Sequence, residues 1–515
     1  MRSAVMPGPR LTRRRLLEAG ATLALAGCAT SGRNPAAGTA ADESRAYRLA
    51  NRLSWGATDA ELERVRRLGE SGYVDEQVRA AAGPLPAPAQ SQIDALSVQQ
   101  RKPLDLWTEI DAARKAGEAR PTEDERKAAQ AAYQQALNRC AREAAQRHLL
   151  RAAYSPNQLL EQMQWFWFNH FNVHQYKSNI RVLLADYEER AIRPHALGRF
   201  RDLLGATTRH PAMLRYLDNE QNAVRRINEN HARELLELHT LGVDGGYTQR
   251  DVQELARVLT GHGVNFGDKA GPAGSVRDGA YEFNPARHDT GDKMLLGRAV
   301  RGRGPDELDD VLDQLALHPA TARFVCRKLA RHLLADEPPP AVVNAMAETW
   351  AGSKGHIGDV LGALLRSPDF TAANQSRFKD PMHFVVSAVR ACYGERVVLN
   401  TQPMQNWLNR LGQGLYNRQT PDGYPCDAAA WSGSGQLAAR LDIARALGSN
   451  ASGLFKTDDA MAPREQPAFP MLARPLYWQV LRPLLGPNTR DALDGAGSPQ
   501  DWNALYLSSP EFMST

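Results

Sequence analysis

The sequence predicts an all-α protein, a multi-helix array with one small β-hairpin in a long loop. Along most of the chain, apolar residues recur every three to four positions, which is the period of a helix with one buried face. Capping-box patterns mark helix starts at Thr58–Glu61 and Thr122–Glu125. A glycine-rich stretch, 262–304, departs from the helical period, and a loop of this length is usually functional or disordered.

The predicted helices follow one another from the first capping box to about residue 450. The first of them carries Leu62, Val65 and Leu68 on one face. The second capping box opens a long helix that runs to about Ala153. Further helices are predicted at 157–174, 179–193, 198–207, 228–241, 249–260, 305–317, 319–334, 340–351, 356–366, 382–393, 402–411 and 434–447.

Two regions break this pattern. The strand candidates Tyr281–Phe283 and Met294–Leu296 predict a small hairpin inside the 262–304 loop. After about residue 450 the period weakens, and prolines interrupt the chain. We therefore expect one helical domain over residues 43–450, with the loop as an insertion, and an irregular C-terminal extension over 451–515.

The first 28 residues have the pattern of an export signal. Arg13 and Arg14 precede a short apolar stretch that ends in Leu-Ala-Gly before Cys28. The arginine pair favours the twin-arginine route, and the apolar stretch is well short of the roughly 20 residues that span a bilayer. The Leu-Ala-Gly-Cys sequence is similar to the bacterial lipobox, in which the cysteine becomes an acylated N-terminus. The alternative is an ordinary signal peptide with an incidental cysteine.

Residues 29–42 are small and polar and predict a flexible tether. Ala29, rather than Asp, favours the outer membrane by resemblance to Gram-negative lipoprotein sorting, so we expect a lipid-anchored protein on the periplasmic face of the cell envelope. Residues 1–27 contain five Arg and one Glu, which is +4 of the whole chain's net charge of +5. The mature protein is therefore near neutral and lacks the basic footprint of a nucleic-acid-binding protein.

Four cysteines follow the signal, and their spacing matches no CxxC-type zinc site. Apolar neighbours favour buried free thiols, although an oxidising envelope leaves disulfides open. Because twin-arginine cargo folds in a reducing cytosol, we expect the fold not to need disulfides. The four are Cys140, Cys326, Cys392 and Cys426.

Candidate chemistry begins in the aromatic segment 165–174. On a helix, His170 and His174 lie one turn apart on the same face, a spacing that can hold one metal ion. No HExxH motif accompanies them, so the alternative is a pair of hydrogen-bonded structural histidines.

The helix predicted over 228–241 is the second candidate. Glu229, Arg233 and Glu237 share a face, and Glu234 lies beside them. These residues form either a solvated salt-bridge ladder or the wall of a cleft, where the carboxylates act as metal ligands or as an acid/base pair.

His288 and Asp289, in the long loop, form either a metal or acid/base group or a polar hairpin turn. Buried charges need partners, and one shared cleft would satisfy all three segments at once. We therefore predict one pocket that gathers His170, Arg233, Glu234, Glu237, His288 and Asp289. The candidate ligands of a divalent metal in this pocket are His170, His174, His239 and His288.

Several short motifs together resemble one family. The similar segments are 51–58, 169–171, 210–214, 228–248, 288–291, 318–322, 367–370 and 420–425. Their order resembles the bacterial domain-of-unknown-function family numbered 1800 (DUF 1800), from about Tyr47 to Gly448. The resemblance implies an exported helical protein, often encoded beside a second twin-arginine protein of alkaline-phosphatase-like fold. It carries over no activity and no catalytic residue.

Two classes of function follow from these observations. The first is an envelope hydrolase or metal-dependent enzyme with its site between the three segments. The second is a non-enzymatic helical scaffold, a partner of a co-exported enzyme. Twin-arginine export favours the first, because that route carries proteins that fold before crossing. The lack of a Gly-x-Ser-x-Gly elbow, an HExxH motif and paired CxxC motifs favours the second.

Overall fold

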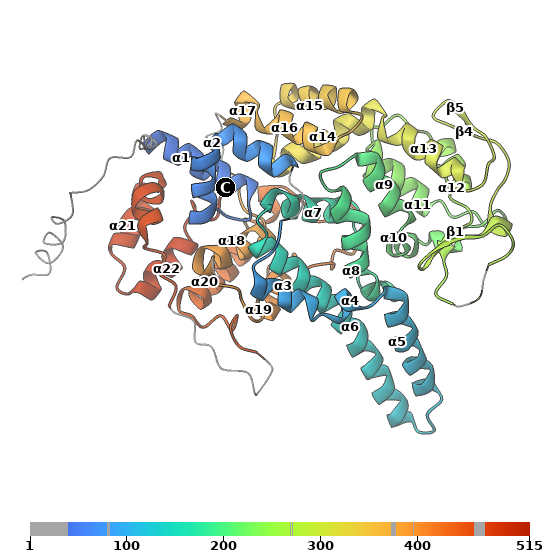
Figure 1. Cartoon of the computed structure of the whole chain (residues 1–515), viewed down its shortest axis with the longest axis horizontal. Coiled ribbons are helices and arrows are strands. Elements are labelled where there is room, and N and C mark those ends of the chain that lie inside the picture. Colours follow the sequence, from blue (N-terminus) through green and yellow to red (C-terminus); the bar gives the residue numbers. More distant parts are fainter. Residues whose placement is uncertain are drawn as a thin grey trace, which may run out of the picture. The chain divides into compact units, whose positions relative to one another are not determined.

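The computed structural model describes residues 40–79, 83–267, 269, 271–371, 377–394, 396–457 and 469–515 (Figure 1). It is 63% helix and 5% strand, which confirms the all-α prediction. The predicted signal, Cys28 and most of the predicted tether lie outside the described residues. No described helix combines the length and apolar character needed to cross a membrane.

The N-terminal helices begin where polar caps place them. Helix α1 (Ala40–Leu53) starts inside the stretch predicted as a tether up to residue 42. Before α2 (Asp59–Arg79), Thr58 and Glu61 exchange hydrogen bonds between side chain and backbone, at 3.2 and 3.3 Å. The same capping box opens α6 (Glu123–Tyr154) at Thr122. Both predicted helix starts are therefore confirmed.

Two long helices, α5 and α6, run side by side before the aromatic segment (Figure 1). Helix α5 (Pro103–Glu118) packs on α6 through a small separate core. That core contains Leu106, Ile110, Leu137, Cys140 and Val182. Two shorter helices, α3 (Ala87–Asp94) and α4 (Ser97–Gln100), precede α5.

Helix α7 (Gln158–His170) is buried along almost its whole length, and its buried polar residues, such as Gln158 and Glu161, have hydrogen-bond partners. Short helical turns follow it, and proline occupies the first position of α10 and the second of η4. These elements are η2 (Ile180–Val182), α8 (Leu184–Asp186), η3 (Tyr187–Ile192), η4 (Arg193–His195), α9 (Phe200–Arg209), α10 (Pro211–Tyr216) and η5 (Asn219–Gln221).

The helix predicted over 228–241 forms as two joined pieces. Helix α11 (Asn230–Glu234) continues into a π-helical turn, η6 (Leu235–Thr240). Helix α12 (Gln249–Val258) follows, capped by Thr248 and Asp251. A π-helical turn widens the backbone, which changes which side chains share a face relative to a regular α-helix.

The 262–304 segment contains two small antiparallel sheets instead of the one predicted hairpin. The first has strand order β1-β3-β2, with His262 and Val276 both opposite Phe283. The second pairs β4 with β5, and Lys293 lies opposite Val300. Strands of three residues are too short to display a period of two, so sequence alone could not find them all. The strands are β1 (His262–Val264), β2 (Val276–Asp278), β3 (Tyr281–Phe283), β4 (Lys293–Leu295) and β5 (Arg298–Val300).

The second half of the chain is again helical, and prolines start most of its helices instead of ending them. The prediction of an irregular extension after residue 450 is wrong. Tyr477 and Leu507 are fully buried, and α22 packs against α20. The helices are η7 (Pro285–Arg287), α13 (Asp306–Ala316), α14 (Pro319–Leu333), α15 (Pro340–Ser353), α16 (Ile357–Leu365), α17 (Pro368–Thr371), α18 (Pro381–Tyr393), α19 (Gln402–Arg410), η8 (Ala428–Ala430), α20 (Ser434–Gly448), η9 (Tyr477–Leu481), η10 (Arg482–Leu484), α21 (Pro487–Asp494) and α22 (Pro499–Leu507).

Candidate functional site

Two of the predicted site histidines meet in the core. His170 is 2% exposed, and its Nε2 lies 3.1 Å from the backbone carbonyl oxygen of His239, to which it donates. The two imidazole rings are 6.1 Å apart. Burial lowers the pKa of both histidines well below the ordinary value, so both rings are neutral at pH 7.

Lys328, on α14, is a cation beside these two histidines that the sequence analysis missed. Its charge contributes to the lowered pKa of His170 and of His239. Burial lowers the pKa of Lys328 itself, while Asp422 and Cys426 act in the opposite direction. Among the described residues Lys328 forms no salt bridge, and its ammonium lies over the ring of Phe324 at 5.5 Å. Nothing in the sequence distinguishes it from the surface cations of the same helix.

Three carboxylates, those of Glu234, Glu237 and Asp422, lie close enough for their charges to interact. Burial raises the pKa of Glu234, and the negative charges of Glu237 and Asp422 raise it further. Glu237 accepts a hydrogen bond from Tyr247 Oη at 3.3 Å. In the described part of the chain, Glu234 has neither a hydrogen bond nor a salt bridge, although it is only half-exposed.

A loop from the C-terminal half carries Asp422 to this place. Asn172, just after α7, donates to the carbonyl oxygens of Arg418 and Thr420 at 3.0 and 2.9 Å. Gly423 has a φ of +77°, and a Cβ there would lie 2.1 Å from the carbonyl oxygen of Asn169. Glycine therefore permits the close approach of this loop to α7. The turn was recognisable from sequence, but its place against α7 was not.

Arg233 belongs to the surface, as the salt-bridge alternative predicted. Its guanidinium pairs with Glu229 at 3.0 Å and bonds Gln249 at 3.0 Å. It pairs with neither Glu234 nor Glu237 in the described structure, although its charge opposes the raised pKa of Glu234. Glu229 and Arg233 thus form a solvated pair that, in the described structure, includes neither Glu234 nor Glu237.

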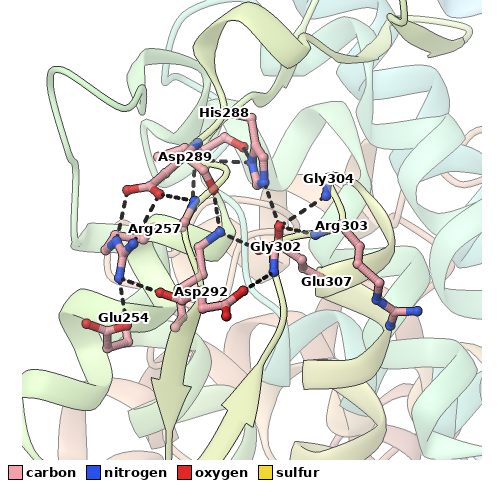
Figure 2. A network of polar contacts seen from close by, with 12 residues as sticks. Glu254, Arg257, His288, Asp289, Asp292, Gly302, Arg303, Gly304 and Glu307 are labelled. Atoms are coloured by element: carbon pink, nitrogen blue, oxygen red, sulfur yellow. Dashed lines mark hydrogen bonds and ion pairs between the residues drawn. The ribbon is translucent and has the colours of Figure 1, made fainter.

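His288 and Asp289 belong to a separate polar network that Figure 2 shows. His288 Nε2 donates to Glu307 Oε1 at 3.0 Å, and Lys293 Nζ donates to Glu307 Oε2 at 2.5 Å. The Glu307 oxygen that faces His288 also accepts from the amides of Arg303 and Gly304. The side chains of His288, Lys293 and Glu307 are at most 1% exposed.

The rest of the network ties the loop to α12. Arg257 bonds both carboxylate oxygens of Asp289, at 2.8 and 3.1 Å, and bonds Glu254 at 2.9 Å. In the described structure no hydrogen bond of His288 or Asp289 reaches His170 or Glu234. A closed set of mutually satisfied charges of this kind fixes the loop and leaves no group free for a substrate. The prediction that these two residues join the six-residue pocket is therefore not supported.

The predicted set of metal ligands does not assemble. Helix α7 ends at His170, and Phe171 is its C-cap, so His174 is not one helical turn further along the same face. His174 instead packs edge-on against Tyr176, and His288 is held by Glu307. Within the described ranges, no group of three or more His, Cys, Asp or Glu side chains is arranged to hold a metal ion.

The four described cysteines are free thiols, as predicted, and two of them are fully buried. Burial raises the pKa of Cys326 to about 12 and that of Cys140 to about 11. Thiols that stay protonated in this way are unreactive.

The fold and the site together define a predominantly helical protein with a half-buried group of carboxylates and, on α14, a lysine that has no salt bridge among the described residues. Comparison with known families assigns the chain: it belongs to the family described as "Protein of unknown function (DUF1800)", which matches residues 48–514. The match reaches beyond Gly448, where the motif resemblance ended, and includes the C-terminal helices. Neither the comparison with curated proteins nor that with solved structures found a match.

Proposed function

We propose that the chain is an exported, lipid-anchored protein of the bacterial cell envelope and that its helical body is a hydrolase. The arginine pair and the Leu-Ala-Gly-Cys28 sequence support the location. The carboxylates of Glu234 and Glu237, with Asp422 beside them, support the activity.

The observation that carries the proposal is the state of Glu234. It is half-buried without a described partner, and its raised pKa keeps it protonated at a higher pH than an ordinary glutamate. A carboxylic acid of this kind serves as a general acid. Glu237, which accepts only a hydroxyl hydrogen bond among described residues, serves as the partner base.

A protonated and an ionised carboxyl group side by side are the pair that cleaves glycosidic bonds. Glu234 gives its proton to the leaving oxygen as the carbon–oxygen bond breaks. Glu237 takes a proton from the attacking water, whose oxygen bonds to the sugar carbon. A glycan of the cell envelope is therefore the substrate class that this site fits best.

The test is dye release from dye-labelled peptidoglycan sacculi by the purified chain. Glu234→Gln keeps the shape but removes the proton donor, and we expect a loss of about 100-fold or more. Glu229→Gln, on the same helix but paired with Arg233, is the matched control and should leave the rate unchanged. The rate should fall as pH rises through the raised pKa of Glu234.

Two outcomes decide against a hydrolase at this site. One is equal dye release by wild type and Glu234→Gln. The other is no release by a well-folded wild type from sacculi or from nitrophenyl glycosides, in which case the chain is better described as a non-enzymatic scaffold for a co-exported enzyme.

A further inference from the structure

A buried lysine and a serine are in contact at the start of α18, away from the site described above. Lys379 directly precedes the helix N-cap, Asp380, and Ser387 lies two turns into the helix. Lys379 Nζ and Ser387 Oγ are 3.2 Å apart, and each residue is 2% exposed. The hydroxyl of Ser387 donates to the carbonyl oxygen of Phe384 at 3.1 Å.

The surroundings of Lys379 disfavour its charged form. Its ammonium lies 4.2 Å from the centre of the Phe512 ring, and no carboxylate pairs with it in the described structure. The carboxylate of the neighbouring Asp380 does not contact Lys379 and instead accepts a hydrogen bond from the amide of His383 at 2.8 Å. Burial and the nearby guanidinium of Arg440 lower the pKa of Lys379 to about 7.

The other ionisable groups around Lys379 do not restore its charged form. Arg440 donates to the carbonyl oxygen of Lys379 at 2.7 Å, which fixes a positive charge nearby. Burial keeps His383 neutral, and Arg377 adds a second positive charge. Tyr47, Arg474 and Tyr506 line the opposite side, and burial raises the pKa of Tyr47 to about 12. These surroundings favour the neutral amine of Lys379 far more than water does.

Two neighbouring cavities lie beside the pair and share part of their walls. The small cavity, about 20 Å³, is lined by Lys379 and Ser387 together with Tyr47, Asn51 and Phe512. A neighbouring pocket of about 330 Å³ shares Tyr47, Asn51 and Phe512 as part of its wall. Its remaining lining includes Leu481, Leu484, Leu485, Arg48 and Arg52.

Residues 510–515 cover the pair. The amide of Lys379 donates to the carbonyl oxygen of Met513 at 2.8 Å, and the amide of Thr515 donates to the carbonyl oxygen of Arg377 at 2.9 Å. Phe512 lies over the lysine and lines both cavities. Gly486 and Thr489 also hold Glu511 by hydrogen bonds at 2.6 and 2.9 Å, so this cover must unfold locally before a substrate can reach Ser387.

We propose that Ser387 and Lys379 are the nucleophile and general base of an acyl-transfer site, and that residues 510–515 gate it. The substrate class is an ester of an apolar acyl group, because leucines and aromatic rings line the adjoining pocket. This activity is independent of the carboxylates at Glu234 and Glu237.

The chemistry follows the serine–lysine variant of the hydrolytic triad. Neutral Lys379 takes the hydroxyl proton of Ser387 as Oγ bonds to the ester carbonyl carbon. The carbon–oxygen bond to the alcohol breaks, and the Lys379 ammonium returns the proton to that leaving oxygen. Water then attacks the acyl-serine, gives a proton to Lys379, and releases the carboxylic acid, after which Ser387 recovers its proton.

The test is covalent labelling of the full chain with an alkyl fluorophosphonate, which forms a bond from phosphorus to an activated serine oxygen and releases fluoride. Peptide mass spectrometry should place the label on Ser387. Lys379→Met should lower the labelling rate by about 100-fold or more. In wild type the rate should rise with pH through about 7, as Lys379 loses its proton.

Four further variants complete the design. Phe512→Ala removes the ring from the cover and should raise the labelling rate by about tenfold, because it favours the open state by roughly 1.4 kcal/mol. Ser449→Ala, an exposed serine on a helix end, is the matched control and should label like wild type. Glu234→Gln should also label like wild type, which separates this proposal from the glycan hydrolase. Equal labelling of Ser387→Ala, or no label on Ser387 in either wild type or a folded Phe512→Ala, would overturn the proposal.

Discussion

Asn169 and Tyr424 exchange two hydrogen bonds across 255 positions of the chain. The side-chain amide of Asn169 donates to the carbonyl oxygen of Tyr424 at 2.9 Å, and the Tyr424 amide donates to Asn169 Oδ1 at 2.6 Å. This pair joins the end of α7 to the loop that carries Asp422. Tyr424 is buried, so it supports the loop from within and does not line an exposed groove.

Asn169→Ala should destabilise the protein by about 1–3 kcal/mol, because it leaves both Tyr424 backbone groups without partners. Asn169→Asp keeps the acceptor only, so its loss should be smaller. Urea unfolding measures both, with the exposed Asn406→Ala as control. Unchanged stability in Asn169→Ala would mean that the loop is held elsewhere.

The fold was largely predictable because helix starts carry local signals. Thr58, Thr122 and Thr248 cap helices through their own side chains, and these contacts span three residues of sequence. The C-terminal helices were missed because prolines were interpreted as breaks. Pro487 and Pro499 instead occupy first helical positions, where the missing amide hydrogen costs nothing.

The site was predictable only in part, because some of its residues carry a local signal in the sequence and others do not. His170, Glu234 and Glu237 stand out because polar residues among apolar ones need an explanation. Lys328 and Asp422 occur in sequence contexts typical of surfaces, and only tertiary packing brings them to that site. Conversely, His288 and Asp289 have the residue types of a catalytic group, but Glu307 pairs with His288 and Arg257 pairs with Asp289 in a closed network.

That network gives a second prediction. Glu307→Gln removes the negative charge that Lys293 contacts in a fully buried setting, and should cost about 3–5 kcal/mol. Urea denaturation measures the loss. Glu348→Gln, an exposed glutamate, should change stability by less than about 0.5 kcal/mol.

The same network predicts an acid sensitivity with a definite sign. Burial alone would raise the pKa of Glu307, but hydrogen bonds from His288 and Lys293 outweigh it, and the net pKa is lowered. Its stabilising contribution is therefore complete above the ordinary glutamate pKa and is lost as pH falls through the lowered value. In Glu307→Gln that part of the acid transition should be absent. An identical acid transition in the variant would contradict this assignment.

Lipidation at Cys28 is a third prediction, which follows from the sequence of the signal. Cys28→Ala should abolish incorporation of a fatty-acid analogue in living cells and leave unprocessed precursor. Cys426→Ala, which removes a thiol of the folded domain, should be labelled like wild type. Equal labelling of the Cys28 variant would leave the chain with an ordinary signal peptide.

The final prediction concerns His231, a fully buried histidine whose two ring nitrogens have no hydrogen-bond partner among the described residues. Burial lowers its pKa to about 3, so the folded protein keeps this ring neutral. The unfolded chain binds a proton at its ordinary pKa of about 6.5. As pH falls below 6.5, the unfolded state therefore gains about 1.4 kcal/mol per pH unit over the folded state, down to about pH 3.

His231→Leu removes this titration and an unsatisfied polar group together. We expect the variant to be as stable as wild type at pH 7, or more stable. Between pH 6.5 and 4 its unfolding free energy should fall less steeply with pH than that of wild type, by the contribution of one bound proton. Urea midpoints at a series of pH values measure the slope. His356→Leu, a partly exposed histidine at the start of α16, should leave that slope nearly unchanged. If His231→Leu is much less stable at pH 7, then His231 has a partner in solution, such as a water molecule or a metal ion.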